Sequence, residues 1–333
     1  MKIIIVGSGI SGLSAAYEMS RLKNVNVELY EMKDQLGGLA KSDTYKNGRY
    51  TEHSWRGYCE SYENLFDIMK NIKVNNKALI QNINKDKLIL SNLNKNGVFG
   101  FIRKMSLIHL CKFIYIFSKN MLSGSERQQN ELSRIKFVKQ ISFLNHQVYL
   151  DLISDLLHIG PDPALVSAKT VNDTMKLGTK WYHLGYPTQE GLIDVWAKYL
   201  KQQNVKIHLN HTLTSISFKN KKIQHTVFNN KINKKADYYI FALPPYALYK
   251  LFQTNKVSKP LRTKIEQLHF RGYHKELSFR LFFKKKIKLG SNLSLANTDW
   301  GIVLIPLHEY WFNSVKLGKD IQGVISGTCV MGY

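Results

Sequence analysis

The chain has 333 residues, of which 44% are hydrophobic, so it is long enough for a sizeable core and for two domains. Its 48 Lys and Arg residues outnumber its 24 Asp and Glu residues and give a formal net charge of +24. Only nine of these basic residues are Arg, whereas nucleic-acid interfaces favour Arg. We therefore interpret the basic residues as solvated side chains of loops and strand edges, and we expect no nucleic-acid partner.

Targeting segments and metal sites are absent from the sequence pattern. No run of about eighteen apolar residues that could span a membrane occurs, and the start lacks a signal-peptide pattern. The cysteines Cys59, Cys111 and Cys329 are far apart and form no metal-ligand spacing. We predict free thiols, no metal site and a cytoplasmic location, and the sequence leaves the oligomeric state open.

The first elements along the chain form a β-α-β unit. Residues 2–6 are an uninterrupted apolar run that ends at a glycine, which is typical of a strand buried in a parallel sheet. A helix is predicted over 11–23 and a second strand over 25–30. The pattern then indicates a helix over 64–73 and a hairpin within 77–91.

Residues 7–12, Gly-Ser-Gly-Ile-Ser-Gly, connect the first strand to the first helix. Gly7 permits a tight turn, Gly9 lets a pyrophosphate approach the backbone, and Gly12 allows the helix to pack closely on the strand. The start of the helix adds free N–H groups and a partial positive charge. This spacing predicts a dinucleotide-binding site.

An acidic residue follows the second predicted strand. Glu31 lies nineteen residues beyond Gly12, where a carboxylate can accept hydrogen bonds from the adenosine ribose hydroxyls. A negative charge at this place disfavours a 2′-phosphate, so FAD or NAD is preferred over NADP.

Residues 99–122 are the most apolar long segment and predict a helix. Two interpretations are open: a helix buried in a second domain, which we favour, or an interfacial helix that dips into a bilayer. The latter would provide a peripheral membrane contact. Residues 123–134 are polar and predict an exposed loop, with further helix up to residue 158.

Strands return after residue 205, at 206–209, 213–219, 223–229 and 237–243. A return of sheet after a helical segment indicates that the dinucleotide-binding domain is discontinuous.

The residues after Glu31 carry a family resemblance. Gly37, Gly38 and Ala40 complete an E-x5-G-G-x-A pattern that resembles the flavin-dependent amine oxidase and phytoene desaturase superfamily. The resemblance implies FAD rather than NAD, with the second glycine pair lying against the cofactor. It also implies an α/β fold in which a discontinuous Rossmann-like FAD/NAD(P)-binding domain carries an inserted α+β substrate domain.

The resemblance extends to two later segments and sets the expected domains. Residues 209–216 and 236–245 are similar to superfamily segments that return to the cofactor, which makes Leu213 and Ala242 its neighbours. We assign 1–75 and 200–250 to the FAD-binding domain. The substrate domain is then 76–199 and 251–333. The expected cofactor-binding residues are Gly7, Gly9, Ile10, Ser11, Gly12, Glu31, Gly37, Gly38, Leu39, Ala40, Leu213 and Ala242.

Candidate catalytic residues follow the glycine pair at the distance where the superfamily places groups beside the flavin ring. His53 and Arg56 are candidates for polarising the flavin or a substrate, and Trp55 for walling the pocket. Full-length relatives also carry a late Gly-Asp segment that closes over the flavin. No such segment occurs before Tyr333, so we expect either a fragment or a shortened member.

These features predict an FAD-dependent oxidoreductase that takes hydride from a small-molecule substrate, either an amine or a lipophilic polyene-like compound. A flavin-dependent UDP-sugar mutase, which shares the same opening, is one alternative. A non-catalytic dinucleotide-binding protein is the other, because of the expected missing segment.

Overall fold

The chain forms two compact units in a computed structural model. The structure describes residues 1–44, 49–52, 56–88, 105–144, 166–176, 180–219, 222–254, 259–269, 277–289, 293–295 and 302–329. Unit 1 comprises 1–43, 65–82 and 187–273. Unit 2 comprises 44–64, 83–186 and 274–333. Both units are therefore discontinuous in sequence.

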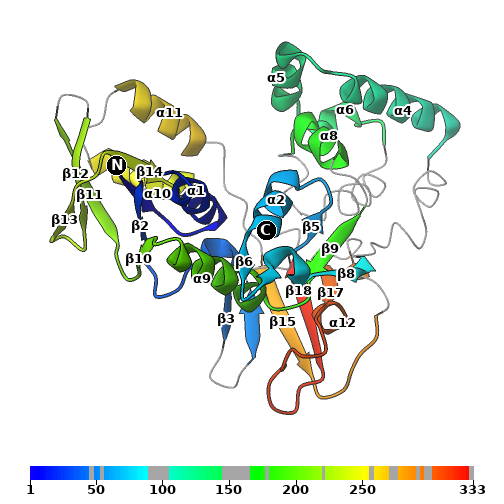
Figure 1. Cartoon of the computed structure of the whole chain (residues 1–333). Coiled ribbons are helices and arrows are strands. Elements are labelled where there is room, and N and C mark those ends of the chain that lie inside the picture. Colours follow the sequence, from blue (N-terminus) through cyan, green and yellow to red (C-terminus); the bar gives the residue numbers. More distant parts are fainter. Residues whose placement is uncertain are drawn as a thin grey trace. The chain divides into compact units, whose positions relative to one another are not determined.

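A four-stranded parallel sheet forms the centre of unit 1 (Figure 1), with the strand order β10-β2-β1-β14. Its strands are β1 (Lys2–Val6), β2 (Asn26–Tyr30), β10 (Lys206–His208) and β14 (Tyr238–Phe241). Helix α1 (Ile10–Ser20) connects β1 to β2 and packs on both. The predicted β-α-β unit is confirmed, and so is the return of the chain to the same sheet after residue 205.

Burial explains why the first residues form a central strand. Ile3, Ile4, Ile5 and Val6 are all buried, as expected for a strand covered on both faces. On α1, Leu13, Ala16 and Tyr17 are buried at a spacing that matches one face of a helix.

Unit 1 contains a second sheet and further helices. A π-helical turn (Gln189–Ile193) leads directly into α9 (Asp194–Gln202), which contacts α1. An antiparallel sheet contains β11 (Leu213–Lys219), β12 (Lys222–Phe228) and β13 (Ile232–Lys234). Further helices and turns are α2 (Glu63–Asn71), which begins at the unit boundary, η2 (Leu79–Asn82), α10 (Pro245–Thr254) and α11 (Lys259–His269).

The hairpin predicted within 77–91 is wrong in its pairing. Strand β7 (Lys77–Ala78) pairs with β6 (Lys73–Val74), and β8 (Ile83–Leu88) pairs with a distant strand, β9 (Trp181–Leu184). The turn between β6 and β7 contains two asparagines with positive φ angles, the conformation that a two-residue hairpin turn requires. Residues 89–91 lie outside the described part of the chain.

The described residues of unit 2 include a four-stranded sheet, a three-stranded sheet and a group of helices. Its larger sheet has the antiparallel order β15-β18-β17-β16, with β15 (Leu277–Phe283), β18 (Gly323–Cys329), β17 (Ile302–Pro306) and β16 (Leu293–Leu295). The smaller sheet has the order β5-β9-β8, with β5 at Tyr58–Cys59. Other elements are β4 (Tyr50–Glu52) and α12 (Leu307–Tyr310), and β3 (Ser42–Thr44) lies at the boundary between the units.

The helical part of unit 2 contains α4 (Leu107–Met121), α5 (Glu126–Arg134), α6 (Phe137–Gln140) and α8 (Ala168–Lys176). We name it the helical subdomain. Helix α4 contacts α8, and so do α5 and α6. These helices enclose an apolar cluster of Leu132, Phe137, Ile141, Leu144, Val166, Ala168 and Val171.

Two predictions for this region are wrong. The segment that we favoured as a buried helix forms α4, but most of its large apolar side chains are exposed, because the apolar cluster uses only one side of the helix. The predicted loop 123–134 contains α5, which a capping box between Ser125 and Gln128 initiates and which buries Leu132. Residues 99–104 and 145–158 of the predicted helices lie outside the described residues.

The described residues also bear on membrane-spanning helices, metal-binding clusters and disulfides. None of the helices in the described ranges is long and apolar enough to cross a membrane. Within the same ranges, no group of His, Cys, Asp and Glu side chains could hold a metal ion. Cys59, Cys111 and Cys329 are free thiols, as predicted.

Candidate functional site

The turn after β1 brings bare backbone to the start of a helix. Gly7 has a φ of +96°, which favours glycine, and an added Cβ would lie 2.5 Å from the carbonyl oxygen of Ala242. Gly9 precedes α1 as its N-cap, and no side chain caps the helix there. An added Cβ on Gly9 would meet no atom within 4 Å, so open space lies in front of this backbone.

The last three positions of the turn, residues 10–12, form the first residues of α1 and determine how closely the helix packs on the strand. A Cβ on Gly12 would overlap the carbonyl oxygen of Gly7, so only glycine permits this close packing. Ile10 and Ser11 are the first two residues of α1. The N–H groups of a helix's first turn have no partner within the helix and attract anions. The turn thus offers donors for a diphosphate with no side chain in the way.

Glu31 lies directly against this turn. One carboxylate oxygen accepts hydrogen bonds from the Ser8 N–H at 3.0 Å and the Ser8 hydroxyl at 2.6 Å, and the other accepts one from the Lys33 N–H at 2.9 Å. The Glu31 backbone is held by hydrogen bonds to His208 and His211. Since a carboxylate offers about four acceptor positions, one remains for a ribose hydroxyl beside the turn.

The second glycine pair packs on the first turn. The Gly37 N–H donates to the Ser8 carbonyl at 2.9 Å, and a Cβ on Gly38 would lie 2.9 Å from the Gly9 Cα. Both glycines have positive φ angles, 112° and 56°. A Cβ on Gly37 would also lie 3.1 Å from Ile193, in the π-helical turn. The two glycine segments that the sequence singled out therefore form one continuous backbone surface.

The remaining predicted cofactor residues differ in their surroundings. Ala242 lies against the turn, and its N–H donates to the Val6 carbonyl at 2.9 Å. Leu213 packs among apolar side chains of the core, which its role as a strand residue explains. Leu39 and Ala40 belong to a short 3-10 turn (η1, Gly38–Ala40), in which Leu39 is exposed.

The geometry of this turn fits the diphosphate and ribose of FAD. Gly9 has open space where a phosphate must approach, and Glu31 is a buried acid with remaining acceptor capacity beside it. A Cβ at Gly9 would fill that space. The residues that would hold the cofactor are the turn 7–12, Glu31 and the glycine pair 37–38.

The predicted catalytic residues lie near the beginning of unit 2. His53 and Trp55 lie outside the described residues. Arg56 is half-buried, close enough to Tyr58 to act on its ionisation. Burial raises the pKa of the Tyr58 hydroxyl, Glu52 raises it further, and Arg56 lowers it. The role of these residues in catalysis stays a prediction.

A buried ion pair lies in the same unit. An Nη atom of Arg280 is 3.1 Å from a Glu52 carboxylate oxygen, and both side chains are almost fully buried. Burial lowers the pKa of Arg280 although Glu52 opposes this. Burial also lowers the pKa of His183, whose ring stacks on Tyr310 at 5.6 Å between centroids. Unit 2 therefore holds an ion pair and a buried imidazole in its interior.

Sequence reasoning missed several of these residues. Ser8 was treated only as part of the glycine turn, although its hydroxyl and N–H fix the Glu31 carboxylate. A small hydroxyl residue between two glycines and a distant acid is the signal that could have found this pair. Arg280 and Glu52 are 228 positions apart, and no local motif connects them.

Comparisons with known proteins agree with this geometry. A family model for flavin-containing amine oxidoreductases matches residues 10–275. A zeta-carotene desaturase of Zea mays is 29% identical over 100 residues, which are 30% of this chain and 16% of that protein. A zeta-carotene desaturase of Capsicum annuum is 30% identical over 24% of this chain and 14% of that protein. The matches thus span less than a fifth of these curated relatives.

Solved structures show the same fold. An oxidoreductase from Methanosarcina mazei has a TM-score of 0.68 at 15% identity, covering 100% of this chain and 79% of that chain. A putrescine oxidase redesigned in its cofactor binding has a TM-score of 0.66 at 12% identity, covering 98% and 75%. With the parallel sheet of unit 1, these likenesses confirm the predicted α/β fold.

Proposed function

Because the chain belongs to the flavin-containing amine oxidoreductase family, we propose that it is an FAD-dependent oxidoreductase that takes hydride from a lipophilic, polyene-like substrate. Membership of this family confirms the prediction of FAD as the cofactor. The observation that carries the proposal is the joined surface of the two glycine segments beside Glu31.

In this proposal the residues of unit 1 bind and orient the cofactor. The N–H groups at the start of α1 hold the diphosphate, and the helix dipole adds to that attraction. Glu31, held in place by Ser8, accepts a hydrogen bond from a ribose hydroxyl. Gly37 and Gly38 let their loop pass close to the cofactor without a side chain. FAD itself supplies the group that accepts hydride.

The residues of unit 2 are proposed to face the substrate. Arg56, with His53 and Trp55, is proposed to polarise or enclose the reacting part of the substrate. A polyene-like substrate is supported by the similarity to zeta-carotene desaturases and by the strongly apolar segment that includes α4. An amine is the other substrate class, because the family model carries that name.

The first experiment tests cofactor and redox activity together. Purified protein is expected to be yellow and to release FAD on denaturation, as identified by mass spectrometry. Mixing it anaerobically with a polyene in detergent micelles should bleach the flavin, whereas amines and UDP-sugars should not. A colourless protein that takes up no added FAD would contradict the proposal.

Other outcomes of this experiment would change the proposed substrate or the proposed reaction. Bleaching by amines alone would replace the polyene by an amine. UDP-sugar binding and turnover only after chemical reduction would favour a mutase, and bound FAD that no substrate reduces would favour a non-catalytic binding protein.

A further inference from the structure

Helix α4 has a second face that the helical subdomain does not cover. Five large apolar side chains on it are more than half exposed: Leu107 (76%), Ile108 (68%), Ile114 (54%), Tyr115 (67%) and Leu122 (84%), the last being the residue that follows the helix. Apolar side chains of this size are usually buried, and a group of them marks an interaction surface. We name these five residues the outer face of α4.

The outer face is an apolar stripe along one side of the helix, which the small exposed side chains of Cys111 and Ser118 interrupt. With about 100° of rotation per residue, its five positions fall within an arc of about 120° around the helix axis. Phe113 lies on the other side of the axis, where it packs against the apolar cluster of the helical subdomain. The helix is therefore anchored on one side and apolar on the other, which is the pattern of a helix that lies in a membrane interface.

Basic residues border the stripe. Lys112 and Lys119 are exposed and follow Ile108 directly around the axis. The described residues of the helical subdomain, 105–144 and 166–176, contain eight Lys and Arg but three Asp and Glu.

Two of those three acids are already paired with a basic neighbour. Glu131 pairs with Arg127, and Asp173 pairs with Lys169. The charge that this subdomain presents is thus positive, which complements an anionic surface.

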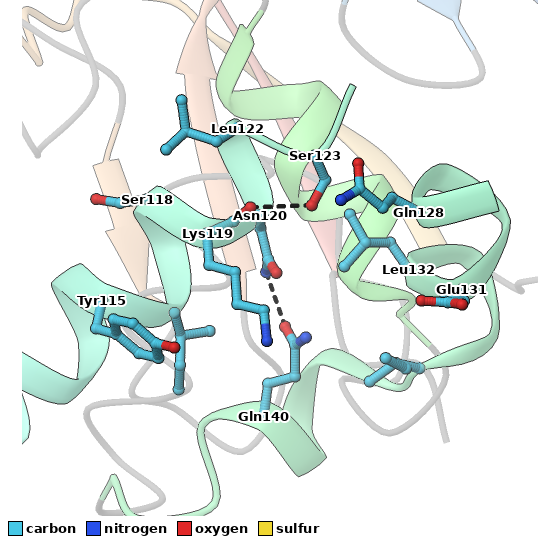
Figure 2. Close-up of a pocket in the computed structure, with 12 residues that line it drawn as sticks. Tyr115, Ser118, Lys119, Asn120, Leu122, Ser123, Gln128, Glu131, Leu132 and Gln140 are labelled. Atoms are coloured by element: carbon cyan, nitrogen blue, oxygen red, sulfur yellow. Dashed lines mark hydrogen bonds between the residues drawn. The ribbon is translucent and has the colours of Figure 1, made fainter. Parts of the chain in front are cut away.

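A pocket opens at the end of the stripe (Figure 2). It has a volume of about 670 Å³, and its lining includes Tyr115 and Leu122 of the outer face together with Lys119. The side-chain amide of Asn120 donates a hydrogen bond of 2.9 Å to Gln140. Figure 2 shows this pair beside Lys119. The pocket therefore places polar groups and a cation next to apolar side chains, as the boundary between acyl chains and headgroups does.

We propose that the outer face of α4 docks on an anionic lipid bilayer. Leu107, Ile114 and Leu122 enter the acyl boundary, while Lys112 and Lys119 lie at the level of the lipid phosphates. The pocket at the end of the helix gives a headgroup room beside Lys119. No residue of this surface belongs to the cofactor site, so lipid binding can be tested separately from flavin binding.

Vesicle flotation tests the proposal on the whole chain. Wild-type protein is expected to float with phosphatidylcholine vesicles that contain about 30% phosphatidylglycerol, and to bind more weakly as salt increases. The double substitution Leu107→Glu with Ile114→Glu should weaken binding by roughly tenfold to a hundredfold, because each loses an apolar side chain from the acyl boundary. Glu at position 107 begins a helix, where a negative charge is tolerated.

Two further variants make the test specific. Leu22→Glu with Leu261→Glu changes exposed leucines in unit 1 and should leave flotation unchanged. Lys112→Gln and Lys119→Gln should each weaken binding about fivefold, and only on anionic vesicles. Circular dichroism and melting curves show that each variant is folded.

Several results would overturn the proposal. The proposal is wrong if wild-type protein does not float with the anionic vesicles. It is also wrong if the Leu107→Glu, Ile114→Glu variant floats as well as wild type. A wild-type dimer that this variant converts to a monomer, without any vesicle binding, would assign the face to a second copy of the chain. None of these readouts uses flavin, so a colourless protein that floats would contradict only the proposed function.

Discussion

The glycine turn of unit 1 and the outer face of α4 in unit 2 are built in opposite ways. At the turn, side chains are absent, and backbone packs on backbone so closely that Gly12 admits no Cβ. On α4, large apolar side chains are present but nothing in the described residues of the subdomain covers them. The site for a small charged group is thus recognised by backbone without side chains. The docking surface is recognised by large apolar side chains that remain exposed.

The largest expected effect is a loss of stability when the buried ion pair of unit 2 is broken. Replacing Glu52 by Leu leaves the buried Arg280 without its partner and should lower the free energy of unfolding by about 3–5 kcal/mol. Glu60→Leu is the control, because Glu60 forms an exposed pair with Lys180 that is worth at most about 1 kcal/mol. Urea denaturation measures both, and equal losses would contradict the buried pair.

The next effect concerns the packing of the turn itself. Gly12→Ala should cost about 3 kcal/mol of stability, at the upper end for overpacking, since the added methyl overlaps the Gly7 carbonyl. The cost should appear in denaturation curves even without cofactor. A variant as stable as wild type would show that the helix and strand are not in such close contact.

A smaller loss of stability is expected when Glu31 loses its charge but keeps its size. Glu31→Gln keeps the size but weakens the hydrogen bonds from Ser8 and Lys33, and should cost about 2 kcal/mol of stability. It should also weaken FAD binding, as measured by fluorescence titration. Glu18→Gln changes an exposed carboxylate on α1 and serves as the control; similar losses in both would argue against a special role for Glu31.

The smallest effect is expected on the outer face of α4. Ile114→Ala should change stability by less than about 0.5 kcal/mol, because the side chain is exposed in the free protein. The same change at the buried Ile141 of the apolar cluster should cost about 2–5 kcal/mol. Thermal melting of the two variants checks this contrast, and a large loss at Ile114 would mean that the face is covered within the chain.

The same comparison explains what the sequence could predict. The β-α-β unit and its glycines were predictable, because strand, turn and helix are adjacent in sequence and each glycine has a local task. Glu31 was predictable from its distance to Gly12. The contact of Gly38 with Gly9 was not predicted, since no local rule brings these positions together; the family resemblance implied only that the second glycine pair lies against the cofactor.

The errors lie where tertiary packing decides. Hydrophobicity predicted the helix at α4, but it could not show which side the apolar cluster would cover. The polar composition of 123–134 hid α5, although the Ser125 and Gln128 capping pattern was present in the sequence. The pairing of Glu52 with Arg280 depends on two elements far apart along the chain, which no pattern within one segment can reveal.

The central claim is that the bare backbone at Gly9 holds the diphosphate of FAD, and Gly9→Ala tests it most directly. An added Cβ there meets no protein atom within 4 Å, so the variant should fold with nearly unchanged stability. Titration with FAD, followed by quenching of flavin fluorescence, should show an affinity roughly tenfold to a hundredfold below that of wild type. A folded Gly9→Ala variant that binds FAD as tightly as wild type would contradict the account.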